Sequence, residues 1–310
     1  MSSLAAEPER PELPRRLPRA WWLALIVIPI SLGFASWYFT ASLEDHQVPL
    51  PPGSEPNRPV AVAPTVDEPL TWPDRRVEGE EAKATLLRVM ERAVARVERV
   101  EYYTAKFLRQ ERVGGVLGPE IVSTLKVRNH PFAIYLKYRT VKPGKEVVYA
   151  EGHHDNKVIA HNGDWTRKLI PRLAVAPDSP LALADSRHPV TDAGLLSLSR
   201  KLLKFRRLDL GDADASTVLD RTTAPDGRPV LRSVHHHSKP AGRPFCHVEI
   251  WYDPETLLPF QISSYDWPAP GQSGPLDLAE RYLYEDLKLD APLSAADFDP
   301  ANPEYAFTRP

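Results

Sequence analysis

The sequence has a single cysteine, Cys246, among 310 residues, so no disulfide can form within the chain. Its 39 lysines and arginines are balanced by 41 aspartates and glutamates, and the basic residues are dispersed along the chain. A nucleic-acid-binding protein would concentrate positive charge on one element or face. The charge pattern therefore excludes nucleic acid as an expected partner.

Motifs that would indicate a reaction are also missing. No G-x-S-x-G sequence presents a nucleophilic serine. Gly114-Gly115 lack the further glycine and lysine of a phosphate-binding loop. Cys246 lies in an apolar, strand-like run with no helix N-terminus to activate it, which is typical of a buried structural residue. We therefore expect no catalytic residue and no cofactor.

One long apolar run is present, Ala20–Leu43, which has 24 residues without a charge. A helix of this length can cross a bilayer core of roughly 30 Å. Four arginines precede the run, whereas Glu44 and Asp45 follow it. Because basic flanks stay in the cytoplasm, the sequence predicts a single-pass inner-membrane protein with a cytoplasmic tail (1–19) and a periplasmic or otherwise extracytoplasmic C-terminal part. A cleaved signal peptide is the alternative, although its apolar core would be shorter, about 7–15 residues.

A proline-rich linker, residues 44–77, follows the apolar run. Eight prolines between Glu44 and Pro73 disfavour helix and sheet and favour an extended spacer. The remaining residues, 78–310, are numerous enough to form one domain with a substantial core.

Two segments of this domain have helical periodicity. Apolar residues recur every three or four positions in 78–100 and again in 191–207. We expect the first segment to be an N-terminal helix that faces the core. The second, inserted between strands, is either an ordinary packed helix or a lid over a pocket.

The other regular segments have the alternation of strands, most clearly between Phe132 and Tyr138. Turn residues separate them at hairpin distances, which favours an antiparallel sheet. So many strands should curl into an open or partial barrel, giving a mainly β protein of the α+β class. The strand-like segments are 102–113, 121–127, 132–138, 147–150, 157–161, 165–170, 216–222, 229–237, 245–252, 259–265 and 282–289.

Several stretches resemble the bacterial lipoprotein-carrier superfamily, the LolA-, LolB- and RseB-like proteins. They are YTAKFLRQERVGG, VRNHPFAIYLKYR, GHHDNKVIAHNGDW, VEIWYDPETLLPFQISSYD and YLYEDLKLDAPLSAADFDP. The nearest match is an uncharacterised membrane-anchored family with the same layout. The resemblance covers about 85–305 and implies a curved antiparallel half-barrel with a helical lid over an apolar cavity.

Apolar side chains on one face of these elements form the candidate ligand site. If the curled sheet leaves a cavity at its mouth, they would contact a lipid or acyl chain. If it does not, they form a filled core under the N-terminal helix. The candidate residues are Tyr103, Phe107, Leu125, Phe132, Ile134, Leu136, Tyr138, Leu195, Leu198, Leu202 and Ile250.

Histidines offer a different kind of site. If the hairpin pairs His235 with His247 and His237 with Phe245, then His235, His237 and His247 share one face of the sheet and could hold Zn²⁺. A shift of one residue in the register would separate them. The favoured prediction is a membrane-anchored, non-catalytic binding protein for an apolar ligand, a lipid or lipoprotein acyl chain. An envelope sensor or scaffold that binds a protein partner is the alternative, and a metal-dependent enzyme at these histidines comes third.

Overall fold

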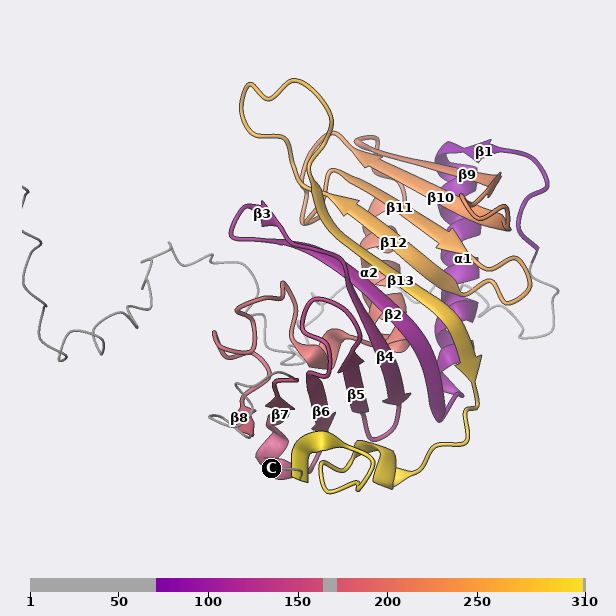
Figure 1. The fold of residues 1–310 in the computed structure, drawn as a ribbon. Coiled ribbons are helices and arrows are strands. Elements are labelled where there is room, and N and C mark those ends of the chain that lie inside the picture. Colours follow the sequence, from indigo (N-terminus) through magenta and orange to yellow (C-terminus); the bar gives the residue numbers. More distant parts are fainter. Residues whose placement is uncertain (1–70, 164–171, 309–310) are drawn as a thin grey trace, which may run out of the picture. The chain divides into compact units, whose positions relative to one another are not determined.

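The computed structural model describes residues 71–163 and 172–308 (Figure 1). The predicted cytoplasmic tail, transmembrane run and most of the linker lie outside these residues, as does the predicted strand 165–170. Within the described ranges, no helix combines the length and the apolar character needed to cross a bilayer.

Helices and strands follow one another in the predicted order in the described part of the chain. The helices are α1 (Gly79–Glu98) and α2 (Leu195–Asp209). The predicted second helix began at 191, but Gly194 is extended and Val190–Asp192 form a separate 3-10 turn, so α2 starts later. The strands are β1 (Val77–Glu78), β2 (Tyr102–Val113), β3 (Val116–Leu117), β4 (Ile121–Arg128), β5 (Ala133–Tyr138), β6 (Glu146–Ala150), β7 (Val158–His161), β8 (Leu173–Val175), β9 (Ala215–Thr223), β10 (Pro229–His237), β11 (His247–Tyr252), β12 (Pro259–Tyr265) and β13 (Leu278–Leu289).

The described strands form one antiparallel sheet. Its order is β1-β9-β10-β11-β12-β13-β2-β4-β5-β6-β7-β8, with β3 paired to β2. The sheet does not close on itself, because the short strands β1 and β8 remain at opposite edges. The predicted fold, a large curved antiparallel sheet that stays open, is confirmed.

Both helices cover the same face of the sheet, here called the inner face (Figure 1). The C-terminal half of α1 and the start of α2 pack on β2, β4, β5 and β6. The N-terminal half of α1 and the middle of α2 pack on β9–β12. Val94 and Leu198 contact both clusters, so the apolar interior is continuous beneath the helices.

Residues before α1 also belong to this fold. Trp72 and Val77, which we assigned to the linker, are buried on the inner face. The Trp72 indole donates a hydrogen bond to the Asp220 carbonyl (3.1 Å), and its ring lies 5.1 Å from that of Tyr252. This segment therefore covers part of β9, whose outer edge would otherwise present unpaired backbone groups.

The opposite face is covered at β4–β7 by the C-terminal tail. Tyr135 and Tyr305 stack with ring centroids 4.1 Å apart, and Phe298 and Phe307 join the same cluster. A buried carboxylate, Glu146, fixes the tail in place. Its oxygens accept hydrogen bonds from the Ala306 backbone N–H (2.8 Å) and His161 Nε2 (3.1 Å), and Lys137 Nζ lies 3.0 Å away.

These contacts make Glu146 a source of acid-sensitive stability. Burial alone would raise the pKa of its carboxyl, but hydrogen bonds from His161, the Ala306 N–H and Lys137 outweigh burial and lower the pKa to about 2. In the unfolded chain a glutamate has a pKa of about 4.3. The stabilisation is therefore complete above about pH 4.3 and is lost as the pH falls toward 2.

We expect Glu146→Gln to lower the free energy of unfolding at pH 7 by about 2–4 kcal/mol, because it removes one partner of a buried charged network. Urea unfolding followed by tryptophan fluorescence measures this, and the variant should also lose stability less steeply between pH 4.3 and 2. The matched control is Glu101→Gln at an exposed position, where a change below about 0.5 kcal/mol is expected. Equal stability of the two variants would contradict the assignment.

Candidate functional site

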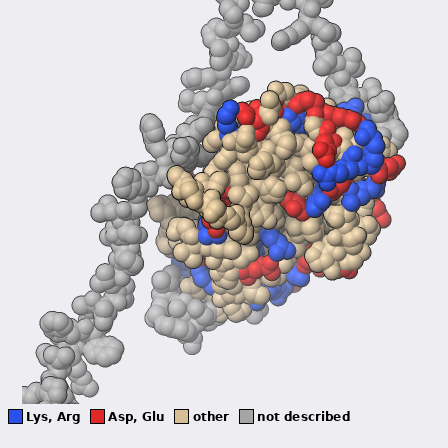
Figure 2. Space-filling model, turned by 90° about the horizontal axis from the view of Figure 1, so that it is seen from above, with Lys and Arg blue, Asp and Glu red and all other residues tan. Residues whose placement is uncertain are grey.

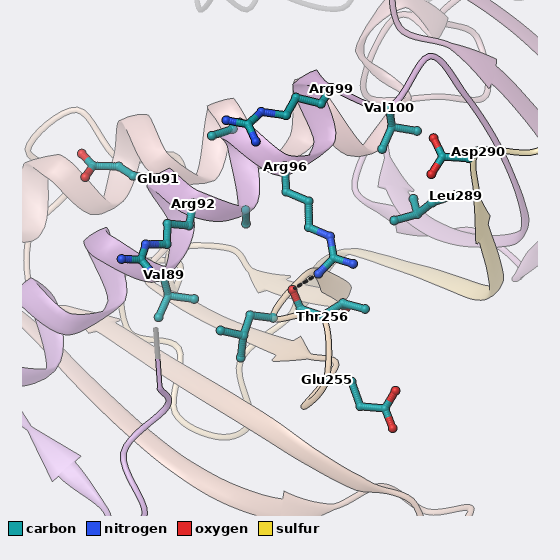
Figure 3. Close-up of a pocket in the computed structure, with 13 residues that line it drawn as sticks. Val89, Glu91, Arg92, Arg96, Arg99, Val100, Glu255, Thr256, Leu289 and Asp290 are labelled. Carbon is teal, nitrogen blue, oxygen red and sulfur yellow. Dashed lines mark hydrogen bonds between the residues drawn. The ribbon is translucent and has the colours of Figure 1, made fainter. Parts of the chain in front are cut away.

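A groove of about 570 Å³ lies beside α1 (Figure 3). Its opposite wall is formed by the loop that joins β11 to β12 and by the end of β13. This volume falls within the range of small-molecule sites, roughly 300–1,000 Å³. Its apolar lining comes from Val89 and Ala93 on α1, from Val100 just after the helix, and from Leu257 and Leu289 on the sheet side. Charged side chains lie among these apolar ones, namely Glu91, Arg92, Arg96, Arg99, Glu255 and Asp290.

Irregular backbone shapes the sheet side of the groove. The pairing of β13 with β2 shifts register between Glu285 and Lys288, and Asp286 within this bulge has a φ of 52°. Leu257 and Asp290 also adopt left-handed backbone, with φ of 58° and 53°. Residues with a side chain beyond Cα adopt this conformation rarely, and a bulge bends its strand and re-aims side chains. The groove therefore lies where the regular ladder is interrupted.

A second hollow of about 170 Å³ adjoins the first, since Thr256 and Leu289 line both. Tyr284, Phe260 and Leu258 give it an apolar part. Together the two hollows extend the site from α1 toward the end of the β12–β13 pair.

The polar contacts of the groove are unevenly distributed. Arg96 donates one hydrogen bond from Nη1 to the Thr256 carbonyl (3.2 Å), which links α1 to the opposite wall (Figure 3). Glu91 forms an ion pair with Arg207 of α2 (3.0 Å). Among the described residues, Arg96 and Arg99 have no carboxylate partner, and Glu255 and Asp290 have no cationic partner. The groove thus presents unpaired charges of both signs beside apolar surface.

Elsewhere on the surface, charges of the two signs are mixed. Figure 2 shows lysines and arginines interspersed with aspartates and glutamates on one part of the visible face, next to a broad area of other residues. No single sign dominates the charged part of this face.

The side chains predicted from sequence to bind a ligand lie in the apolar interior. Tyr103, Ile134 and Leu195 are fully buried, and the Tyr103 hydroxyl accepts a hydrogen bond from the Leu195 backbone N–H (2.6 Å). Two apolar clusters lie beneath the helices, the first under the C-terminal half of α1 and the second under its N-terminal half. Ten of the predicted residues belong to or pack against one of these clusters, and Leu198 contacts both. None of the predicted residues lines either hollow. The first cluster holds Tyr103, Phe107, Leu125, Phe132, Ile134, Leu136, Tyr138 and Leu195, and the second holds Leu202 and Ile250.

Sequence reasoning missed the groove. A signal was present at the end of α1, where Arg92, Arg96 and the capping residue Arg99 follow helical spacing beside the apolar stripe. Nothing in the sequence marked Leu257 or Asp290, because left-handed backbone at a leucine or aspartate has no reliable pattern.

The predicted three-histidine face is wrong, because the register of β10 and β11 differs by one residue from the assumed one. His235 pairs with Val248 and His236 with His247. His235 and His237 therefore point inward and are buried, while His247 lies on the other face beside His236. Across the described ranges, no group of three or more His, Cys, Asp or Glu side chains is arranged to hold a metal ion.

The inward histidines belong to a buried polar cluster at the end of α2. Asp209 accepts hydrogen bonds from Arg243 Nε (2.7 Å) and His237 Nε2 (3.1 Å), and Arg206 Nε lies 3.2 Å from it. Burial opposes ionisation of Asp209, but the hydrogen bond from His237 and the charge of Arg206 lower its pKa below the ordinary value. Burial also lowers the pKa of His235 well below its usual range, so this ring is neutral. The cluster joins α2 to β10 and the loop after it.

We expect Asp209→Asn to cost about 3–5 kcal/mol of unfolding free energy, because it leaves two buried guanidinium groups without their shared carboxylate. Chemical unfolding checks this. Asp226→Asn, in the exposed turn between β9 and β10, serves as the matched control and should change stability by less than about 0.5 kcal/mol. A loss at Asp209 no larger than the control would show that the cluster does not hold α2 to the sheet.

The geometry defines a mainly β protein in which an open antiparallel sheet carries two helices on one face. The chain belongs to the DUF1571 family, proteins of unknown function, whose model matches residues 100–307. No curated protein matches the sequence.

Solved structures also resemble the chain, at identities of 10–15%. MucB shares 15% identity, with 71% of this chain and 63% of MucB covered and a TM-score of 0.37. The lipoprotein LppX of Mycobacterium tuberculosis shares 13% identity, with 70% and 99% covered and a TM-score of 0.37. A domain described as an outer membrane lipoprotein-sorting protein from Vibrio parahaemolyticus shares 10% identity, with 69% and 95% covered and a TM-score of 0.33.

Proposed function

We propose that this domain binds the apolar chain of a lipid or lipoprotein in the groove between α1 and the β11–β12 loop, without catalysing a reaction. The observation that carries the proposal is an open groove of about 570 Å³ whose apolar lining continues into the core beneath α1. Ala93 and Val100 belong both to the groove lining and to the first apolar cluster.

Burial of a hydrocarbon chain supplies the driving force. Each CH₂ group removed from water contributes about 0.8 kcal/mol. A stretch of ten such groups would contribute about 8 kcal/mol before the entropy of association is subtracted. The irregular backbone at Leu257 and Asp290 supports the proposal, since strained conformations collect at ligand sites.

Membrane attachment is the second part of the proposal. Ala20–Leu43 would hold the chain in the inner membrane with its N-terminus in the cytoplasm, and the proline-rich linker would let the domain reach lipid at the outer surface of that membrane. A binding site for acyl chains is useful at that position, because its ligands are concentrated there.

A protein partner is supported less well. A docking surface of that kind calls for a contiguous exposed apolar patch. In the described part of the chain, five large apolar side chains are exposed, and only two of them, Leu208 and Leu210, belong to the same segment. They are Val116, Val141, Leu181, Leu208 and Leu210.

Photochemical labelling tests the proposal on the full chain in detergent micelles. A fatty alcohol that carries a diazirine in its chain should label peptides containing residues 89–100 and 255–257. Ala95→Trp places a bulky ring at an exposed position of the groove lining, so we expect it to reduce this labelling at least fivefold.

The matched control is Val116→Trp, at an exposed apolar position in the β2–β3 hairpin, which should leave labelling of the groove unchanged. Labelling that avoids 89–100 and 255–257, or that is equal in both variants, would refute binding in the groove.

A further inference from the structure

We infer that the groove receives a phospholipid with a zwitterionic headgroup, whose phosphate lies at Arg96 and Arg99 and whose ammonium lies toward Asp290. The inference rests on the proposed function, because it assigns the headgroup of the lipid whose chain occupies the same groove. It follows from the unpaired charges among the lining residues.

The phosphate side is formed by α1. Arg96 lies in the last turn of α1, and Arg99 is the residue that caps the C-terminal end of the helix. Figure 3 shows Arg96 reaching across the groove to the Thr256 carbonyl, while the Arg99 side chain extends back along the helix. That bond uses one of the five N–H donors of Arg96, and neither guanidinium has a carboxylate partner in the described chain. The planar fork of an arginine such as Arg96, which reaches into the groove, matches the oxygens of a phosphate.

The ammonium side is formed by the residue that follows β13. Asp290 lines the groove beside Leu289, at the end of the groove where Arg99 and Val100 lie (Figure 3). Its carboxylate has no cationic partner in the described chain, whereas that of Glu91 is already held by Arg207. A purely anionic headgroup would be attracted to the arginines but repelled by Asp290. A headgroup that carries both a phosphate and an ammonium group is attracted to the arginines through the first and to Asp290 through the second.

The helix dipole accounts for only part of this arrangement. Positive residues in the last turn of α1 offset the partial negative charge at its C-terminus. The dipole does not explain why a carboxylate lies on the opposite wall. Nor does it explain why apolar side chains such as Val100 and Leu289 line the groove together with the arginines and this carboxylate. These features together describe the junction between a headgroup and an acyl chain.

Competition against the neutral photoprobe on the full chain in a non-ionic detergent tests the inference. The competitors are phosphatidylethanolamine, phosphatidylglycerol and diacylglycerol with identical acyl chains, together with inorganic phosphate. We expect phosphatidylethanolamine to displace the probe at a concentration about tenfold lower than diacylglycerol, the effect of one charge-assisted contact. Phosphatidylglycerol should fall between them.

Substitutions test which residues contact the phosphate and which contact the ammonium. Arg96→Gln with Arg99→Gln should remove the advantage of both phospholipids over diacylglycerol. Asp290→Asn should remove the advantage of phosphatidylethanolamine over phosphatidylglycerol. Arg88→Gln is the matched control, since Arg88 lies on α1 but does not line the groove, and it should preserve the ranking.

Each contrary result has a distinct meaning. Equal displacement by the three lipids would overturn the headgroup assignment while leaving chain binding in place. Stronger displacement by phosphatidylglycerol than by phosphatidylethanolamine would overturn the role of Asp290. Displacement by inorganic phosphate at the same concentration as by phospholipid would overturn the lipid as the source of the phosphate. Failure of the probe to label the groove would instead overturn the proposed function itself.

Discussion

The pairing of β2 with β13 is the contact on which the rest of this structure depends. These are the two longest strands, twelve residues each, and they join the strands before α2 to the strands after it. Their inner face is held by aromatic contacts, with the Phe107 ring 4.9 Å from that of Tyr284 and 6.0 Å from that of Tyr282. Because the partners lie far apart in the sequence, closing this loop costs considerable chain entropy, which the burial on both sides must offset.

The same pair also creates the groove. The bulge after Glu285 shifts the register before Lys288 and Leu289 pair with β2 again. Asp290, with its left-handed backbone, then ends the strand beside the groove. The groove is therefore a consequence of how the two halves of the sheet are joined, and a substitution that regularised the bulge would alter fold and site together.

Much of the fold could be predicted from the sequence, because the spacing of apolar residues and the residues that favour turns are local features. The apolar stripe on α1 and the alternation from Phe132 to Tyr138 each identified the side chains that face the interior. The register of β10 against β11 could not be predicted, because a shift of one residue keeps the alternation and exchanges the faces. His247 was placed beside His235 for that reason, whereas the loop after His237 brings Cys246 opposite it, with a backbone hydrogen bond of 2.8 Å.

The candidate site was harder to predict than the fold for a related reason. Apolar alternation identifies side chains that face the interior, and a close-packed interior is where such side chains lie whether or not a ligand binds. Placing an acyl chain among Ile134, Leu136 and Leu195 would require these side chains to separate and lose their mutual contacts. The groove beside α1 is open, so a chain that enters it gains apolar contact without breaking any. Binding in the groove therefore disrupts fewer contacts than binding in the core would. For this reason, the few irregular residues at the end of β13 matter more for the site than the many regularly packed residues of the core.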